Sequence, residues 1–275
     1  MATQMLHIFR NTPFGRETLL QSCDFARELN LSLVVYIPKF TKFLMYFEND
    51  VVQIDLDHSY LYCPHTAREH ALEILQETGV TFNFLDPKHF TASSLPDVPT
   101  NFDLFCCPRS ISDLSSKIGL GYIGPKVRRI VRAGQFPVLI TSNVYKPWES
   151  IAVFFGGSAA AVNALRLGIR MAQITKKPLQ VFTYLENANR NSIQQIIEEE
   201  KLEAEMEAHV DEWHFFDHGS LQENLYSVPH DALLVIGAFG HGLIRSLVFG
   251  SKLEKIQSVM PNNMLVVGPK YTATF

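Results

Sequence analysis

The chain has 275 residues, 47% of them hydrophobic, which is enough to bury one large core or two of ordinary size. Lys and Arg number 24 against 28 Asp and Glu, so neither nucleic acid nor an anionic membrane surface is an expected partner. Its four cysteines form no CxxC pair and no apolar run nears the roughly 18 residues that span a bilayer, so we expect a reduced, cytoplasmic protein without a membrane span.

Runs rich in β-branched and aromatic residues predict five strands in each half of the chain. In the first half they are residues 6–9, 31–37, 80–85, 103–107 and 137–141. In the second half they are residues 150–155, 178–185, 212–216, 232–236 and 263–267. Amphipathic helical patterns separate them, such as RETLLQSCDFARELN in the first half and SAAAVNALRLGIRMAQ in the second. The order of elements therefore repeats.

Alternation of strand and helix predicts, in each half, a parallel sheet with right-handed crossovers and helices on both faces. The fold class is therefore α/β, with two tandem domains that each hold a five-stranded parallel sheet. We place the domains at residues 1–145 and 146–275, because the stretch SNVYKPWES at the boundary is polar and contains a proline. The first half carries an aromatic insert at residues 39–63, for which a lid or a contact surface is the expected role.

A glycine-rich stretch, GAFGHGLIRSLVFGS at residues 237–251, follows the predicted strand ALLVI and precedes a helical pattern. A turn of this kind after a parallel strand aims backbone N–H groups and a helix N-terminus at one point, which suits phosphate. Glycine is required where a Cβ would block close approach or where φ is positive. Spacing alone leaves phosphate binding and a purely structural turn open, because the stretch is neither a Walker loop nor GxGxxG.

The strand ALLVIG followed by G-x2-G-x9-G-S, a helix and the strand MLVVG closely resembles the universal stress protein family. The likeness covers the whole second half, and the doubled strand order is similar to that of a tandem member. The resemblance implies a Rossmann-like fold of the adenine nucleotide alpha hydrolase type. In the nucleotide-binding branch of the family, this glycine pattern wraps the ribose and phosphates of ATP.

Carried over position by position, the resemblance implies a nucleotide site in the second domain. Gly237 and Gly240 would approach the ribose and the phosphate chain, and Gly250 with Ser251 would hold the terminal phosphates. Tyr184, which ends the second predicted strand of this half, would lie near the adenine. The expected ligand is ATP or a related adenine nucleotide, with or without Mg²⁺.

Three further residues belong to the predicted site. Ile236 precedes the motif as the family's apolar residue does, and His241 either donates to a phosphate or is an exposed loop histidine. Phe239 is bulky for its place in the motif and could stack on a base or cover the site. A second departure is Gly156, which stands where the family has an Asp beside the nucleotide.

The matching region of the first half, DLFCCPRSISDLSSKIGLGYIGPKVRRI, is degenerate. Arg109 and Ser112 stand where glycines belong, only Gly124 survives, and Arg10 replaces the first-strand Asp. We therefore expect no ATP in the first domain. Either the basic residues that follow accept another anion together with Arg109 or, as we favour, they form a solvated helix face; they are Lys126, Arg128, Arg129 and Arg132.

Other clusters are interpreted as structural. Cys106 and Cys107 are predicted to be packing thiols. The acidic segment IIEEEKLEAEMEAHVDEW is predicted to form a helix with one solvated face, with Ile193, Ile197 and Met206 near one apolar stripe. Two groups have metal-ligand residue types but poor spacing, and a metal site is not expected at either. They are His65, Glu69 and His70, and His214, Asp217 and His218.

No GxSxG elbow, HExxH motif or P-loop lysine is present, so no catalytic residue is assigned. The predicted function is a stress-response regulator whose second domain binds adenine nucleotide and so alters the surface offered to an unknown protein partner. The alternatives are a scaffold of the same fold that binds no nucleotide, or a slow ATP hydrolase. The halves are expected to pair through their last strands into an internal pseudo-dimer, and two chains could associate further as a homodimer.

Overall fold

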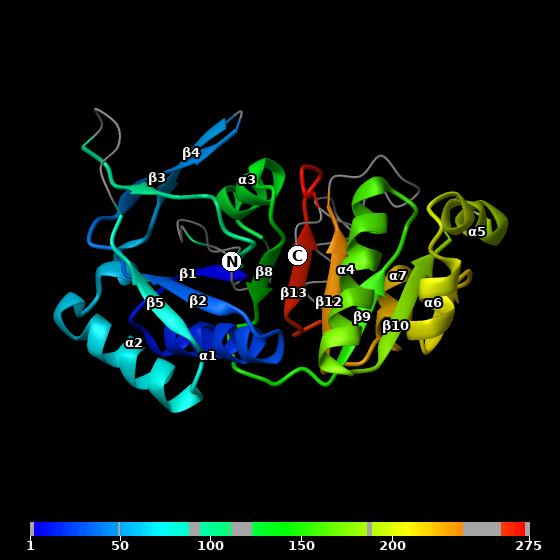
Figure 1. Cartoon of the computed structure of the whole chain (residues 1–275), viewed down its shortest axis with the longest axis horizontal. Coiled ribbons are helices and arrows are strands. Elements are labelled where there is room, and N and C mark those ends of the chain that lie inside the picture. The colour runs from blue at the N-terminus through cyan, green and yellow to red at the C-terminus, as the bar shows by residue number, and fades with distance from the viewer. Residues whose placement is uncertain are drawn as a thin grey trace. The chain divides into compact units, whose positions relative to one another are not determined.

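The computed structural model describes residues 3–48, 50–87, 94–109, 111, 123–185, 189–238 and 260–272. The chain divides into two compact units, unit 1 at Met1–Pro147 and unit 2 at Trp148–Ala273. Each unit contains a five-stranded parallel sheet in which the strands, numbered within the unit, follow the order 3-2-1-4-5 (Figure 1). The predicted α/β fold with two tandem units is confirmed.

The sheet of unit 1 has the order β5-β2-β1-β7-β8, and every neighbouring pair is parallel. Its strands are β1 (Gln4–Ile8), β2 (Ser32–Tyr36), β5 (Phe82–Leu85), β7 (Leu104–Pro108) and β8 (Val138–Thr141). All residues of β2, SLVVY, are buried. Continuous apolar runs of this kind are typical of parallel strands that are covered on both faces.

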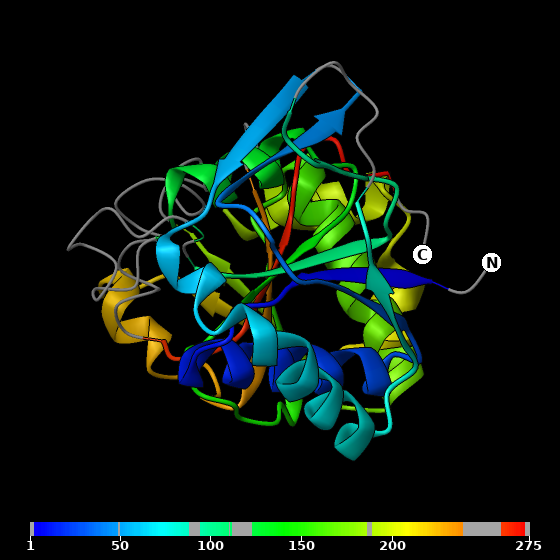
Figure 2. The same ribbon diagram turned by 90° about the vertical axis from the view of Figure 1, so that its left-hand side faces the viewer.

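Helices α1 (Pro13–Glu28) and α2 (Pro64–Thr78) pack together on one face of this sheet (Figures 1 and 2). Both begin with a proline, whose missing N–H costs nothing in the first turn of a helix. The Thr12 hydroxyl caps α1 by accepting the Gly15 N–H at 3.0 Å. Helix α2 ends at Gly79, which has the left-handed φ of 66° that favours glycine.

The insert of unit 1 forms a small sheet on the opposite face (Figures 1 and 2). Strands β3 (Lys42–Phe47) and β4 (Asp50–Asp55) pair antiparallel, and β6 (Asp97–Val98) pairs parallel with β3. Phe43 is fully buried, and its ring meets the Tyr36 ring of β2 edge to face, with centroids 5.5 Å apart. The insert is therefore a structural layer over the unit 1 sheet.

The insert layer explains why unit 1 departs from the predicted alternation of strand and helix. A helix is expected between β5 and β7, yet the described residues of that crossover, 86–87 and 94–103, contain β6 and no helix. A parallel sheet still needs apolar cover on both faces, and the insert together with α3 (Pro125–Ala133) supplies it.

The sheet of unit 2 has the order β11-β10-β9-β12-β13, again parallel throughout. Its strands are β9 (Ser150–Phe154), β10 (Leu179–Tyr184), β11 (Glu212–Phe216), β12 (Ala232–Gly237) and β13 (Met264–Val267). Helix α4 (Ala159–Thr175) lies against β9 and β12 (Figure 1). A short helix, α7 (Leu221–Leu225), begins with a capping box formed by Ser220 and Glu223.

The acidic segment of unit 2 forms two helices, not the single predicted one. Helix α5 (Arg190–Glu199) and helix α6 (Glu203–His209) are separated by Lys201, whose φ is 56°. The predicted buried stripe is correct, because Ile193, Ile197 and Met206 are all buried. The break lets Leu202 enter the core as well, where it is 1% exposed.

A buried polar chain crosses the core of unit 1. Nδ1 of His7, on β1, lies 2.8 Å from the Ser22 hydroxyl, and that oxygen lies 2.8 Å from Sγ of Cys106. Burial lowers the pKa of His7 to about 3 and raises the pKa of Cys106 to about 12. Both groups are therefore neutral at pH 7, and the thiol acts as a packing group, as the sequence indicates.

The neutral state of His7 predicts a pH-dependent stability. Below pH 6.5 the unfolded chain binds a proton that folded His7 takes up only near pH 3, so stability falls as the pH is lowered through that window. The expected slope is up to about 1.4 kcal/mol per pH unit. Urea unfolding from pH 7 to 4 should show a steeper loss for the wild type than for His7→Asn, which cannot titrate. Parallel curves would contradict a buried neutral imidazole.

Candidate functional site

The candidate site of unit 2 lies where its sheet reverses direction. Strands β9 and β12 lie side by side, but the chain leaves β9 toward β10 on one side and leaves β12 toward β13 on the other. Such a topological switch point, at the carboxyl ends of the strands, is where open parallel α/β sheets bind ligands. The glycine-rich stretch predicted to bind nucleotide begins at this point, with Gly237 at the end of β12.

Three predicted site residues come to this edge of the sheet. Ile236 and Gly237 end β12, and Tyr184 ends β10, so they lie at the carboxyl ends of the two strands that flank β9. Ile236 is buried, whereas Tyr184 is half-buried. The other five predicted residues lie outside the described part of the chain: Phe239, Gly240, His241, Gly250 and Ser251.

Gly237 is required by a contact within the protein. A Cβ at this position would lie 2.4 Å from the carbonyl carbon of Ala160 and 2.4 Å from the nitrogen of Ala161. The end of β12 therefore packs directly against the first turn of α4. The sequence interpretation missed this contact, and the available signal was the run of alanines at 159–161, which are small enough for a close approach.

The turn from β9 into α4 completes the edge. It consists of Gly156, Gly157 and Ser158, and Gly157 has a φ of 74° that disfavours any side chain. The Ser158 hydroxyl caps α4 by accepting the Ala161 N–H at 3.2 Å. No acidic residue lies in the first turn of this 17-residue helix, so its positive end faces the switch point uncompensated. Such an edge can receive an anion.

The equivalent edge of unit 1 carries arginines in place of these glycines. The repeat aligns Arg10 with Gly156 and Arg109 with Gly237. Arg109 follows β7, its carbonyl accepts the Gly124 N–H at 2.8 Å, and burial lowers the pKa of its side chain. Ser112 lies outside the described residues. The first edge therefore differs from the second in charge and in the space left free.

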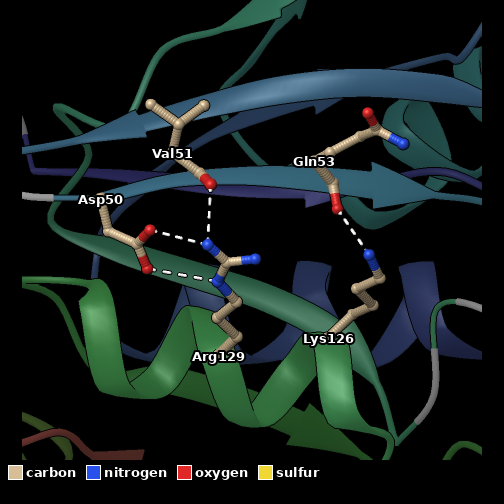
Figure 3. Close-up of polar contacts among 5 residues, drawn as sticks. All are labelled: Asp50, Val51, Gln53, Lys126 and Arg129. Atoms are coloured by element: carbon tan, nitrogen blue, oxygen red, sulfur yellow. Dashed lines mark hydrogen bonds and ion pairs between the residues drawn. The ribbon is translucent and has the colours of Figure 1, made fainter.

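The basic residues of α3 form the predicted solvated face only in part: Arg129 and Arg132 are exposed, but Lys126 and Arg129 are paired with β4. Lys126 donates to the Gln53 carbonyl at 2.9 Å and lies 3.0 Å from the Asp55 carboxylate (Figure 3). Arg129 donates to both carboxylate oxygens of Asp50, at 2.7 and 3.2 Å, and to the Val51 carbonyl at 3.0 Å (Figure 3). These two side chains hold the edge strand β4 by its backbone. Arg128 donates to the Ile123 carbonyl and Arg132 is exposed.

In the cluster of His214, Asp217 and His218, His214 and Asp217 are engaged in contacts within the protein. His214 stacks on Phe182 and lies 2.8 Å from Glu212, and Asp217 pairs with Arg190 at 3.2 Å. Across the described ranges, no group of three or more His, Cys, Asp and Glu side chains could hold a metal ion. No helix in that part of the chain is long and apolar enough to cross a membrane.

The fold defines a class of protein: two tandem Rossmann-like α/β units, each with a five-stranded parallel sheet that has a topological switch point. No protein-family model matches the sequence. Universal stress protein Slr1230 of Synechocystis is 23% identical over 218 residues, which are 74% of this chain and 72% of the relative. A universal stress protein structure from Archaeoglobus fulgidus matches with a TM-score of 0.60 and 17% identity, over 96% of both chains.

A candidate universal stress protein from Pseudomonas aeruginosa matches with a TM-score of 0.56 and 14% identity, over 98% of this chain and 94% of that one. The structures establish the shared fold, and the curated relative adds the likeness in sequence. Together they make the chain similar to two-domain universal stress proteins, in fold and, at 23% identity, in sequence.

The close contact at Gly237 predicts a large cost for a single methyl group. Gly237→Ala would place Cβ against backbone atoms that cannot move aside, and we expect a loss of about 3 kcal/mol in the free energy of unfolding. Gly79→Ala is the control, because its Cβ meets nothing within 4 Å and only the φ of 66° opposes it, at about 1 kcal/mol. Urea unfolding of both variants tests the contact. Equal losses would contradict it.

Proposed function

We propose that the protein is a cytoplasmic stress-response regulator that binds ATP or a related adenine nucleotide at the switch point of unit 2. The single observation that carries the proposal is the coincidence of the glycine-rich stretch with that point. Gly237 ends β12 beside the Gly156–Ser158 turn and the positive end of α4, so motif and topology select the same edge.

The composition of this edge fits a nucleotide. Gly156 carries no side chain, so the backbone there could approach a ribose or a phosphate closely, whereas the space beside Gly157 is filled by Ile196 and the space beside Gly237 by the first turn of α4. Tyr184, half-buried at the end of β10, offers an aromatic ring on which an adenine could stack. Gly240, Gly250 and Ser251 would hold the phosphates, and the Ser251 hydroxyl would donate a hydrogen bond to a phosphate oxygen. Mg²⁺ would bind the phosphate oxygens of the nucleotide and offset their negative charge.

Regulation is favoured over catalysis by the chemistry available at this edge. Its described residues are glycines, a capping serine, a tyrosine and an isoleucine, which include no nucleophile–base pair and no carboxyl or imidazole group. Nucleotide binding would order the edge and change the surface that a protein partner meets. A scaffold without nucleotide is the rival, and it is favoured by the structural need for Gly237 and by the missing Asp at Gly156.

The test is nucleotide binding by the full chain and by two matched glycine variants. We expect one ATP per wild-type chain by titration calorimetry, and the same nucleotide to be released on denaturation and identified by mass spectrometry. Gly250→Val should lose binding at least tenfold, because a side chain there would block the phosphates. Gly124→Val, at the counterpart position in unit 1, should bind as the wild type does; its φ of −62° accepts a side chain.

Four outcomes decide between the proposals. Wild-type binding that is lost only in Gly250→Val supports the site in unit 2. Binding lost in Gly124→Val instead would move the site to unit 1 and contradict the assignment. No binding by a folded wild-type chain would leave the scaffold as the function, and turnover well above background would make the protein a hydrolase.

A further inference from the structure

Helix α5 lies against the turn that leads from β9 into α4, at the carboxyl-terminal edge of the unit 2 sheet (Figure 1). Gly157 of that turn has a φ of 74°, and a Cβ on it would lie 2.5 Å from Cδ1 of Ile196 and 3.6 Å from Cδ1 of Ile193. The two isoleucines therefore pack directly against the glycine. This contact brings α5 to the same edge at which we propose that nucleotide binds.

The isoleucines of α5 differ in how deeply they are buried. Ile193 and Ile197 are each 1% exposed, so they attach the helix to the core of unit 2. Ile196 is only half-buried, so its side chain contacts Gly157 on one side and reaches the surface on the other. Ile196 therefore closes the approach from solvent to the Gly157 backbone, and it does so without being part of the core.

The two ends of α5 are held by contacts that solvent reaches. Arg190, in the first turn, lies 3.2 Å from Asp217 and stands over the Phe215 ring, 4.7 Å from its centroid; the Arg190 and Asp217 side chains are 58% and 43% exposed. Glu200, just after the helix, pairs with Arg166 of α4 at 2.8 Å, and both side chains are about 40% exposed. Exposed contacts of this kind add little stability, and a helix of ten residues is not stable alone. We therefore expect α5 to open locally while the sheet stays folded.

We propose that α5 is a gate over the edge of unit 2 and that Ile196 is the side chain that closes it. In the structure, Ile196 fills the space beside Gly157 through which a nucleotide would reach the backbone. Opening of α5 uncovers this backbone, so nucleotide binds only the fraction of molecules whose gate is open, and the measured affinity is reduced by that fraction. The inference rests on the proposed function and adds to it a residue that limits access to the site.

The experiment measures ATP binding by titration calorimetry for the full chain and for Ile196→Ala. The substitution uncovers Gly157 and leaves the buried anchors Ile193 and Ile197 in place. We expect the variant to bind ATP about three- to tenfold more tightly than the wild type, because more molecules offer an open edge. Ile174→Ala is the matched control: Ile174 lies on α4 and is 43% exposed, and its truncation should leave the affinity unchanged.

The outcomes separate the gate from the proposed function. If the wild type binds ATP and Ile196→Ala binds it equally or more weakly, the proposed function stands and the gate is overturned. A gain that also appears in Ile174→Ala overturns the gate too, because the effect would not depend on the contact with Gly157. Binding by Ile196→Ala alone supports the gate and means that the wild type stays closed. If neither folded protein binds ATP, both proposals fail.

A milder variant and a measurement without nucleotide keep the test decisive if Ile196→Ala does not fold. Ile196→Val removes a single methyl group, and a smaller gain in affinity is expected. Amide hydrogen exchange of the wild type should be at least about tenfold faster in residues 193–199 than in the middle of α4, because α5 opens without the rest of unit 2. Exchange in α5 that is as slow as in α4 would contradict a helix that opens by itself.

Discussion

The structure depends on one constraint: a parallel sheet must be covered by apolar side chains on both faces. Unit 1 satisfies it in an unusual way. Helices α1 and α2 cover one face, but the insert contributes much of the other cover through residues such as Phe43, Met45 and Ile54, which are fully buried. The aromatic character of the insert follows from this burial. Its edge strand β4 is then held by Lys126 and Arg129 of α3 through backbone carbonyls, which leaves fewer free edge groups for other chains.

The two units use the same topology and different chemistry at the strand ends. In unit 2, Gly237 lets β12 pack against the first turn of α4, and Gly157 leaves space that the Ile196 side chain fills. In unit 1, arginines take the matching positions, and Arg10 draws in a carboxylate of the chain. The two edges therefore offer different groups at the same place in the topology: glycines in unit 2, and in unit 1 an arginine that is paired with Asp57. The two units thus share one fold while the residues at their strand ends differ.

Much of the fold could be predicted from the sequence, because its signals are local. Strand composition, helical periodicity and the repeated order gave both sheets with small shifts in the strand bounds, such as 82–85 for the predicted 80–85. Long-range pairings could not be found this way. Strand β6 has two residues and pairs with β3 more than 50 positions away, so no local pattern marks it. The break at Lys201 was missed because one left-handed residue does not disturb the apolar spacing.

The location of the candidate site could be predicted from the sequence, but some of the contacts that require its residues could not. The glycine spacing selected the end of β12, yet the packing of Gly237 on Ala160 and Ala161 depends on how a strand and a helix meet in space. The roles of Lys126, Arg129 and Arg10 likewise depend on the insert, whose position the sequence did not indicate. A glycine motif therefore indicates that another group lies close to the backbone, and that group can belong to the protein as well as to a ligand.

The central claim, that the nucleotide site lies in unit 2 alone, is tested most directly by photolabelling with an azido derivative of ATP, followed by peptide mapping. We expect label on peptides that contain Tyr184 or residues 232–251, and we expect unmodified ATP to compete with the labelling. Specific label on peptides that contain Arg10 or Arg109 would contradict it.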